Sequence, residues 1–267
     1  YNQKFKENDL VLHSFQLLNM FSSRMSAKEF TRMAAIISNI ARGNCYVPSF
    51  LQLHSTPLNE SIITGMEIVP KFRKDYNLQE VNVVFLTDGD GDISNTGFYY
   101  TNDNGLQKID NSFFWNRKHV MVITDPVTHQ EEIVERLSDS KSYTEAFVKL
   151  LKARTHCNVL GFYVLNAREL HNYLGNHMKN ANVVDSLRKQ FSKEKHCVVT
   201  NAGFDEYYLL NSKAINETEV EFEVGARTTT RGLVTAFSKY ANARVQNKIV
   251  LNRFIGMISG EKHASAF

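Results

Sequence analysis

The sequence predicts an α/β fold, a doubly wound and mostly parallel sheet with helices on both faces. Segments of helical periodicity alternate with short apolar runs, and the links between them are short. Two of these runs, residues 81–86 and 158–165, are continuous and rich in β-branched and aromatic residues. Such runs are typical of strands buried on both faces of a parallel sheet.

Length and composition indicate a globular protein with a substantial core. The chain has 267 residues, of which 43% are hydrophobic and 22% charged. A net charge of +3 is too close to neutral to indicate direct binding to nucleic acid or to an acidic membrane. No apolar run approaches the roughly eighteen residues of a membrane span. Three cysteines without paired spacing favour a reduced, cytoplasmic protein.

The first part of the chain predicts a strand and a helix. Residues 10–20 are expected to form a strand, or a strand followed by a turn. Ser26 and Glu29 have the spacing of a capping box at the start of a helix. The apolar residues that follow recur on one helical face, and Gly43 is expected to end the helix.

A second helix and a small antiparallel insertion come next. The helix is expected over residues 58–76, with Pro57 suited to its first turn. Pro70 should kink the helix or end its regular part. Residues 89–135 carry turn signals of two hairpins, so we expect an insertion of small antiparallel strands after the strand at 81–86.

The remaining elements continue the alternation of helix and strand. The expected helices cover residues 143–155, 168–174 and 182–191, and the expected strands cover residues 158–165 and 196–201. One or two further helices are expected over residues 229–258. We therefore divide the chain into an α/β domain, residues 1–225, and a helical C-terminal extension, residues 226–267.

Three aspartates crowd together directly after the strand at 81–86. Asp88, Asp90 and Asp92 alternate with glycines, and carboxylates this close need water, a cation or donors from another loop. An EF-hand loop is excluded because Ile93 and Tyr99 stand where it needs glycine and glutamate. A haloacid-dehalogenase motif fits poorly, whereas the short Asp-x-Asp clamp of nucleotide-sugar transferases stays open. Nine histidines form no ligand cluster, so zinc is not indicated.

A second loop offers oxygen atoms that complement these carboxylates. In an open α/β sheet, ligands bind beyond the carboxyl ends of the strands, where residues 87–89 (Thr-Asp-Gly) lie. Ser55 and Thr56 come just before the helix at 58–76 and can present hydroxyl groups. A hydroxyl and a carboxylate oxygen, completed by water, are ligands that Mg²⁺ prefers.

Four stretches together resemble the von Willebrand factor A domain of CobT-type cobaltochelatase proteins, in the versions found in large tailed phages. They are FSSRMSAKEFTRM, STPLNESIITGMEIVPKF, VNVVFLTDGDGD and LKARTHCNVLGFYVL, and the resemblance covers most of residues 15–210. It implies a metal-ion-dependent adhesion site in which Thr56 and Asp88 bind Mg²⁺ or another divalent cation. Ser55 and Asp90 are expected to support the two metal loops.

The sequence departs from this family at the first metal loop. The family carries Asp-x-Ser-x-Ser after its central strand, well before the position of Thr56, and no segment here fits it. The one segment with a similar pattern, DISNT at residues 92–96, follows a different strand from the one that the family's loop follows. A sheet that lacked its middle strand would leave backbone groups unpaired. We therefore expect an upstream segment, or a separate N-terminal fragment, to supply the strand and the loop.

The resemblance implies an adaptor and no enzymatic activity of the chain alone. The implied partner is an AAA+ ATPase of the MoxR or CobS type, whose acidic side chain would complete the coordination of the metal. Two alternatives stay open. One is a non-ATPase subunit of a magnesium or cobalt chelatase that acts on a tetrapyrrole. The other is a virion or scaffold protein with the same fold and no working metal site.

Overall fold

The computed structural model describes about two thirds of the chain and confirms that the fold is mixed α/β. The described residues are 5–12, 15–43, 47, 56–91, 96–101, 104, 107–110, 120–134, 140–178, 180–199, 203–212, 252 and 256. They form two compact units, each described by itself below. The first unit comprises Tyr1–Val81 and Asp90–Cys157, and the second comprises Asn82–Gly89 and Asn158–Phe267.

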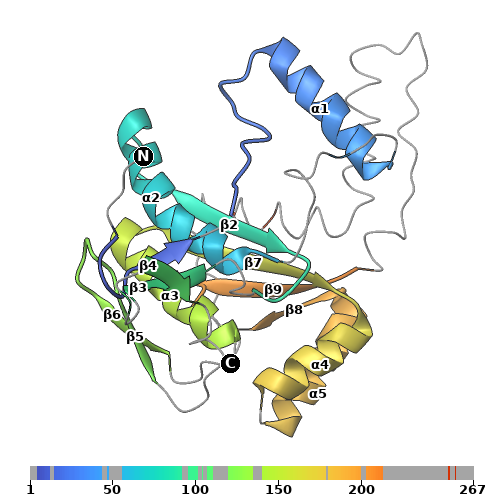
Figure 1. The fold of residues 1–267 in the computed structure, drawn as a ribbon. Helices are drawn as coiled ribbons and strands as arrows, with labels where there is room; N and C mark the ends of the chain where they lie inside the picture. Colours follow the sequence, from blue (N-terminus) through green and yellow to red (C-terminus); the bar gives the residue numbers. More distant parts are fainter. Residues whose placement is uncertain are drawn as a thin grey trace. The chain divides into compact units, whose positions relative to one another are not determined.

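The second unit contains a four-stranded sheet in the order β2-β7-β9-β8 (Figure 1). Its strands are β2 (Asn82–Thr87), β7 (Asn158–Leu165), β8 (His196–Val199) and β9 (Glu206–Asn211). The first three in spatial order are parallel, and β8 is antiparallel to β9. The strands predicted at 81–86, 158–165 and 196–201 are therefore confirmed, whereas β9 was not predicted.

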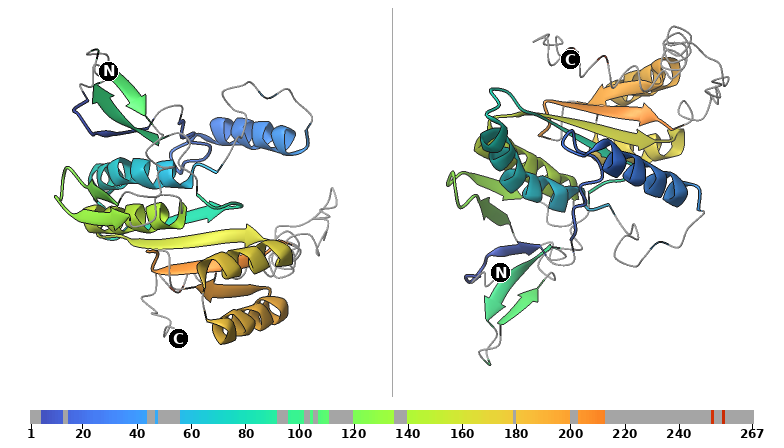
Figure 2. Two further views of the ribbon diagram at one scale, coloured as in Figure 1. Left: turned by 60° about the horizontal axis from the view of Figure 1, so that its bottom comes forward. Right: turned by 90° about the horizontal axis from the view of Figure 1, so that it is seen from above.

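Two helices cover one face of this sheet, α4 (Ala167–His177) and α5 (Ala181–Glu194) (Figure 2). Tyr173 of α4 packs its ring edge-on against Tyr163 of β7, with the ring centroids 5.8 Å apart. Tyr207 of β9 lies on the same face, 6.5 Å from Tyr173. On the opposite face the buried side chains form one apolar cluster of Leu160, Phe162, Tyr208 and Leu210.

Strand β2 lies at the edge of the described sheet. Among the described strands it pairs with β7 alone, where Val84 is opposite Leu160 and Leu86 is opposite Phe162. Val84 is 41% exposed and Leu86 69% exposed, although their partners on β7 are each 1% exposed. The prediction that this strand is buried on both faces is therefore wrong, because an apolar run does not reveal where its strand stands in the strand order.

The first unit is built around two packed helices, α2 (Leu58–Tyr76) and α3 (Ser140–Thr155). Both confirm predicted helices. Pro70 does not end α2, which continues to Tyr76. The buried side chains of Met66 and Val69 hold the turn before the proline, so tertiary packing outweighs the hydrogen bond that Pro70 cannot donate.

The expected antiparallel insertion is present in the first unit. Strand β1 (Leu10–Leu12) pairs with β3 (Thr96–Thr101), which pairs with β4 (Gln107–Asp110). Strands β5 (Met121–Thr124) and β6 (Glu131–Val134) form a second hairpin. The pairing of β1 with β3 was not predicted, because it joins residues almost ninety positions apart along the chain.

Helix α1 (Ala27–Ala41) begins with the predicted capping box of Ser26 and Glu29. Its C-cap is Arg42, and Gly43 follows with a φ of 67°, which a glycine adopts without strain. No residue of α1 is buried. Of the helices predicted over residues 229–258, only Asn252 and Gly256 are described, both as helical, and Ser55 and Asp92 lie outside the described residues.

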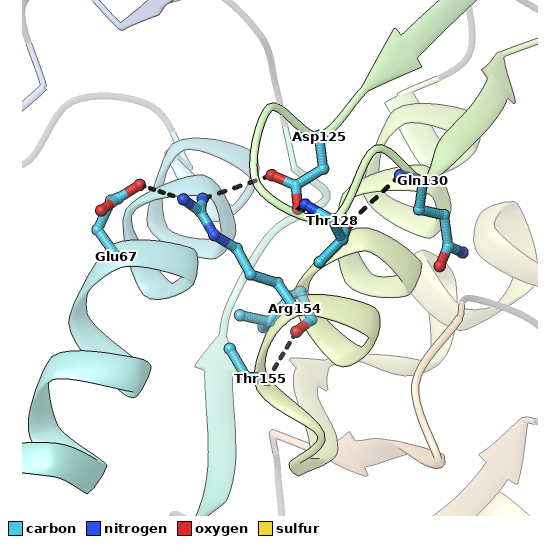
Figure 3. Close-up of polar contacts among 7 residues, drawn as sticks. Glu67, Asp125, Thr128, Gln130, Arg154 and Thr155 are labelled. Atoms are coloured by element: carbon cyan, nitrogen blue, oxygen red, sulfur yellow. Dashed lines mark hydrogen bonds and ion pairs between the residues drawn. The ribbon is translucent and has the colours of Figure 1, made fainter.

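A buried ion pair ties the second hairpin to the helices of the first unit (Figure 3). Asp125 at the end of β5 accepts hydrogen bonds from the hydroxyl and the backbone N–H of Thr128, at 2.6 and 3.0 Å. Its other oxygen lies 3.6 Å from the guanidinium of Arg154 on α3, which also pairs with Glu67 on α2 at 2.7 Å. Burial acts to raise the pKa of Asp125, but Thr128 and Arg154 together hold it below the ordinary value.

Gly161 of β7 is required by close packing in the second unit. A Cβ added there would overlap the ring of Tyr207 and lie 3.1 Å from Phe204, and both rings are buried. We expect Gly161→Ala to lower the free energy of unfolding by about 2–3 kcal/mol, measured by urea denaturation. Gly175→Ala in α4, where a Cβ meets nothing within 4 Å, should instead raise it by about 0.5–1 kcal/mol. Equal effects of the two changes would contradict the packing.

The two carboxylates that contact Arg154 differ in burial and should differ in energetic effect. Asp125→Asn should lower the free energy of unfolding by about 2–3 kcal/mol, because it leaves a largely buried guanidinium without its buried partner. Glu67→Gln should change it by less than about 0.5 kcal/mol, since the Glu67 side chain is 75% exposed.

The same pair predicts a pH dependence. Because folding lowers the pKa of Asp125, its contribution is present above the ordinary pKa of an aspartate and is lost as the pH falls through the folded pKa. The Asp125→Asn variant should lose less stability than the wild type on acidification. A parallel loss in both proteins would show that Asp125 is not a source of the pH dependence.

Candidate functional site

Asp88 stands immediately after the last residue of β2, at the carboxyl end of a parallel strand. It is exposed, and the turn around it is closed by its neighbours. The hydroxyl of Thr87 donates a hydrogen bond to the carbonyl of Gly89 at 2.8 Å and accepts one from the Gly89 N–H at 3.2 Å. This turn fixes the backbone on both sides of Asp88, so an accessible carboxylate is held on an ordered loop.

Thr56 stands just before α2 in the first unit. It is half-buried, and its carbonyl accepts a hydrogen bond from the Leu58 N–H at 2.8 Å. The N-cap of α2 is Pro57, and no side chain caps the helix. Among the described residues, the Thr56 hydroxyl is therefore not the cap of α2.

The first turn of α2 carries two buried polar side chains that the sequence analysis did not single out. Asn59 accepts a hydrogen bond from the Thr144 hydroxyl of α3 at 2.7 Å. Glu60 accepts one from the Thr96 hydroxyl of β3 at 3.3 Å. The side chains of Asn59 and Glu60 are fully buried. A carboxyl group in the first turn of a helix interacts favourably with the helix dipole. In the sequence, Asn59 and Glu60 are marked only as an Asn-Glu pair at the start of the predicted helix.

The expected metal ligands fall in different compact units. Thr56 and the exposed Asp90 belong to the first unit, and Asp88 belongs to the second. Gly91, which follows Asp90, is buried against Asn59 and Thr144 of the first unit. Ser55, the other expected support, lies outside the described residues.

The hydroxyl of Thr56 and the carboxylate of Asp88 are the kinds of ligand that a hard cation binds, but there are too few of them to hold one. Hydroxyl and carboxylate oxygens are ligands of Mg²⁺, which demands nearly octahedral coordination. In the part of the chain that the structure describes, no group of three or more His, Cys, Asp or Glu side chains could hold a metal ion. Thr56 and Asp88 alone are too few, so a bound cation would need further ligands from water or from another segment.

Comparisons of the chain with protein-family models, with curated proteins and with solved structures found no match. Among the described helices, none is long and apolar enough to cross a membrane.

Proposed function

We propose that the chain is a cytoplasmic, metal-dependent adaptor of the von Willebrand factor A type, working with an AAA+ ATPase of the MoxR or CobS type. One observation carries the proposal. Asp88 is exposed at the carboxyl end of β2, within a turn ordered by the Thr87 hydroxyl. Ligands of open α/β sheets bind at this end of the strands.

In this proposal Asp88 and Thr56 would help to hold a Mg²⁺ ion, which would supply a coordination position for an acidic side chain of the partner. Asp88 supplies a carboxylate oxygen and Thr56 a hydroxyl oxygen. The remaining positions are taken by water, by an Asp-x-Ser-x-Ser loop from another segment, and by an acidic side chain of the ATPase. Mg²⁺ retains part of its water shell and binds few protein carboxylates, so an exchangeable position for a partner suits its chemistry.

The sequence and exposure of β2 at the edge of the described sheet support the proposal that a second segment adds a strand there. The strand reads Asn-Val-Val-Phe-Leu-Thr and carries no charged residue and no proline. Natural edge strands are protected by such residues, because an open ladder of backbone groups pairs with other chains. The apolar face of the sheet also continues outward to the exposed side chains of Val84 and Leu86. We therefore propose that a strand of an N-terminal segment, followed by the Asp-x-Ser-x-Ser loop, pairs with β2.

Replacing the carboxylate ligand tests the metal site directly. On the intact native protein, Asp88→Asn should weaken Mn²⁺ affinity at least about tenfold, measured by electron paramagnetic resonance of free and bound Mn²⁺, because an amide cannot replace the charge. Asp185→Asn, which changes an exposed aspartate of α5, is the matched control and should leave the affinity unchanged. Binding of the ATPase should require Mg²⁺ in the wild type and be lost with EDTA.

Two results would contradict this function. One is equal Mn²⁺ affinity of the wild type and Asp88→Asn. The other is ATPase binding that persists in EDTA. Tight association without any divalent cation would favour the scaffold role instead.

A charge placed on the edge of β2 that no described strand covers tests the added strand. Where that segment is a separate N-terminal fragment, Leu86→Lys should abolish its co-purification, identified by intact mass spectrometry, because a lysine protects an edge against pairing. The fold should persist, since Leu86 is already 69% exposed. Val183→Lys on α5, at a side chain that is 40% exposed, is the matched control and should retain the segment. A lone 30.6 kDa species in the wild-type preparation would refute the added strand.

A further inference from the structure

Helix α1 and the segment before it carry an exposed apolar surface. No residue of the helix is buried. The exposed side chains include Leu17 at 55%, Phe21 at 48% and Phe30 at 51%. The rings of Phe21 and Phe30 contact each other, with their centroids 5.1 Å apart, so these two side chains form one patch. An exposed apolar patch among polar residues is typical of a surface that binds a protein or a membrane.

The patch is hollowed at the start of α1. An open recess there is lined by the apolar side chains of Phe21, Met25 and Phe30 and by neighbouring small and hydroxyl-bearing residues. The guanidinium of Arg24 lies over the ring of Tyr76 at the end of α2, 4.1 Å from its centroid. The segment that lines the recess is thus attached to α2. A recess of this kind accepts a protruding side chain of a protein, which a lipid surface does not offer.

Positive charge surrounds the recess. Arg24, Lys28 and Arg32 are exposed, and each directly follows a residue that lines the recess. The one acidic side chain of α1 is Glu29. Its carboxylate accepts hydrogen bonds from the backbone N–H and the hydroxyl of Ser26, both at 2.8 Å, and is held in the capping box. The three cations therefore outnumber the acidic groups at this end of the helix, which favours a negatively charged occupant.

We propose that this recess binds an acidic segment of a partner protein, in which one apolar side chain is flanked by aspartates or glutamates. The apolar side chain enters between Phe21, Met25 and Phe30, and the carboxylates contact the surrounding cations. Basic amphipathic helices bind acidic proteins or anionic membranes, and the recess favours the protein. A second copy of this surface fits less well, because it would bring like charges together. The interaction needs no metal ion, so it is independent of the proposed site at Asp88.

A short acidic peptide tests the recess on the intact native protein. The probe is a fluorescein-labelled peptide with one phenylalanine between two runs of three glutamates, and its binding is followed by fluorescence anisotropy in EDTA. The probe should bind, and its affinity should fall as the salt concentration rises. A peptide with lysines in place of the glutamates should bind at least about tenfold more weakly, and so should one with alanine in place of the phenylalanine.

Two substitutions in α1 locate the binding surface. Phe30→Ser removes part of the lining of the recess, and Arg32→Glu reverses a charge beside it. Each should weaken binding of the acidic peptide at least about tenfold. The matched controls are Val183→Ser and Lys189→Glu, which change an exposed apolar and an exposed basic side chain of α5 and should leave binding unchanged. Phe30→Ser should shift the urea midpoint of unfolding no more than Val183→Ser does, since both side chains are exposed.

Four results would overturn the proposal, and none of them depends on the metal site. The first is no binding of the acidic peptide, or equal binding of the lysine peptide. The second is binding of phosphatidylglycerol vesicles in place of the peptide, which would assign the surface to a membrane. The third is a dimer in light scattering that Phe30→Ser abolishes, which would assign it to a second copy. The fourth is a much larger fall of the urea midpoint in Phe30→Ser than in Val183→Ser, which would show that the chain itself covers the patch.

Discussion

The ladder between β2 and β7 is the interaction on which the candidate site depends. It runs in parallel register from Asn82 opposite Asn158 to Thr87 opposite Tyr163, and the Asn158 amide donates to the Asn82 side chain at 2.9 Å. Since β7 is the one neighbour of β2 among the described strands, this ladder fixes the register in which the carboxyl end of β2 lies within the second unit. The Thr87 turn then converts the strand end into an ordered loop that presents Asp88.

The candidate site combines an ordered backbone with a small set of candidate ligands. At the start of α2, Asn59 lies against Gly91 and Glu60 accepts a hydrogen bond from Thr96, while Asp88 and Asp90 are exposed. This division suits a cation that exchanges ligands, since the loops need to be fixed while the carboxylates stay accessible. Among the described residues, the oxygen atoms are too few to hold Mg²⁺ by themselves, and no strand pairs with the second edge of β2. A further strand that joined this chain would cover the edge of β2, and its loop would supply the missing ligands.

Local signals in the sequence predicted most elements, and long-range pairing decided the rest. The capping box at Ser26, the bounds of β7 and the two hairpins follow from neighbouring residues and were predicted. The edge position of β2 could not be predicted in this way, because strand order is set by partners far along the chain. Asn59 and Glu60 look like ordinary polar residues of a helix start. In the structure both are buried, and Thr144 and Thr96, 85 and 36 residues away along the chain, donate hydrogen bonds to them.

The most direct test of a cation at the end of β2 is paramagnetic relaxation by Mn²⁺, followed through the backbone amide resonances of the intact native protein. Substoichiometric Mn²⁺ should broaden the resonances of Thr87, Asp88 and Gly89 first and leave those around Asp185 on α5 sharp, because the effect falls steeply with distance from the ion. Broadening that begins elsewhere, or is equal at both aspartates, would contradict a metal site at Asp88.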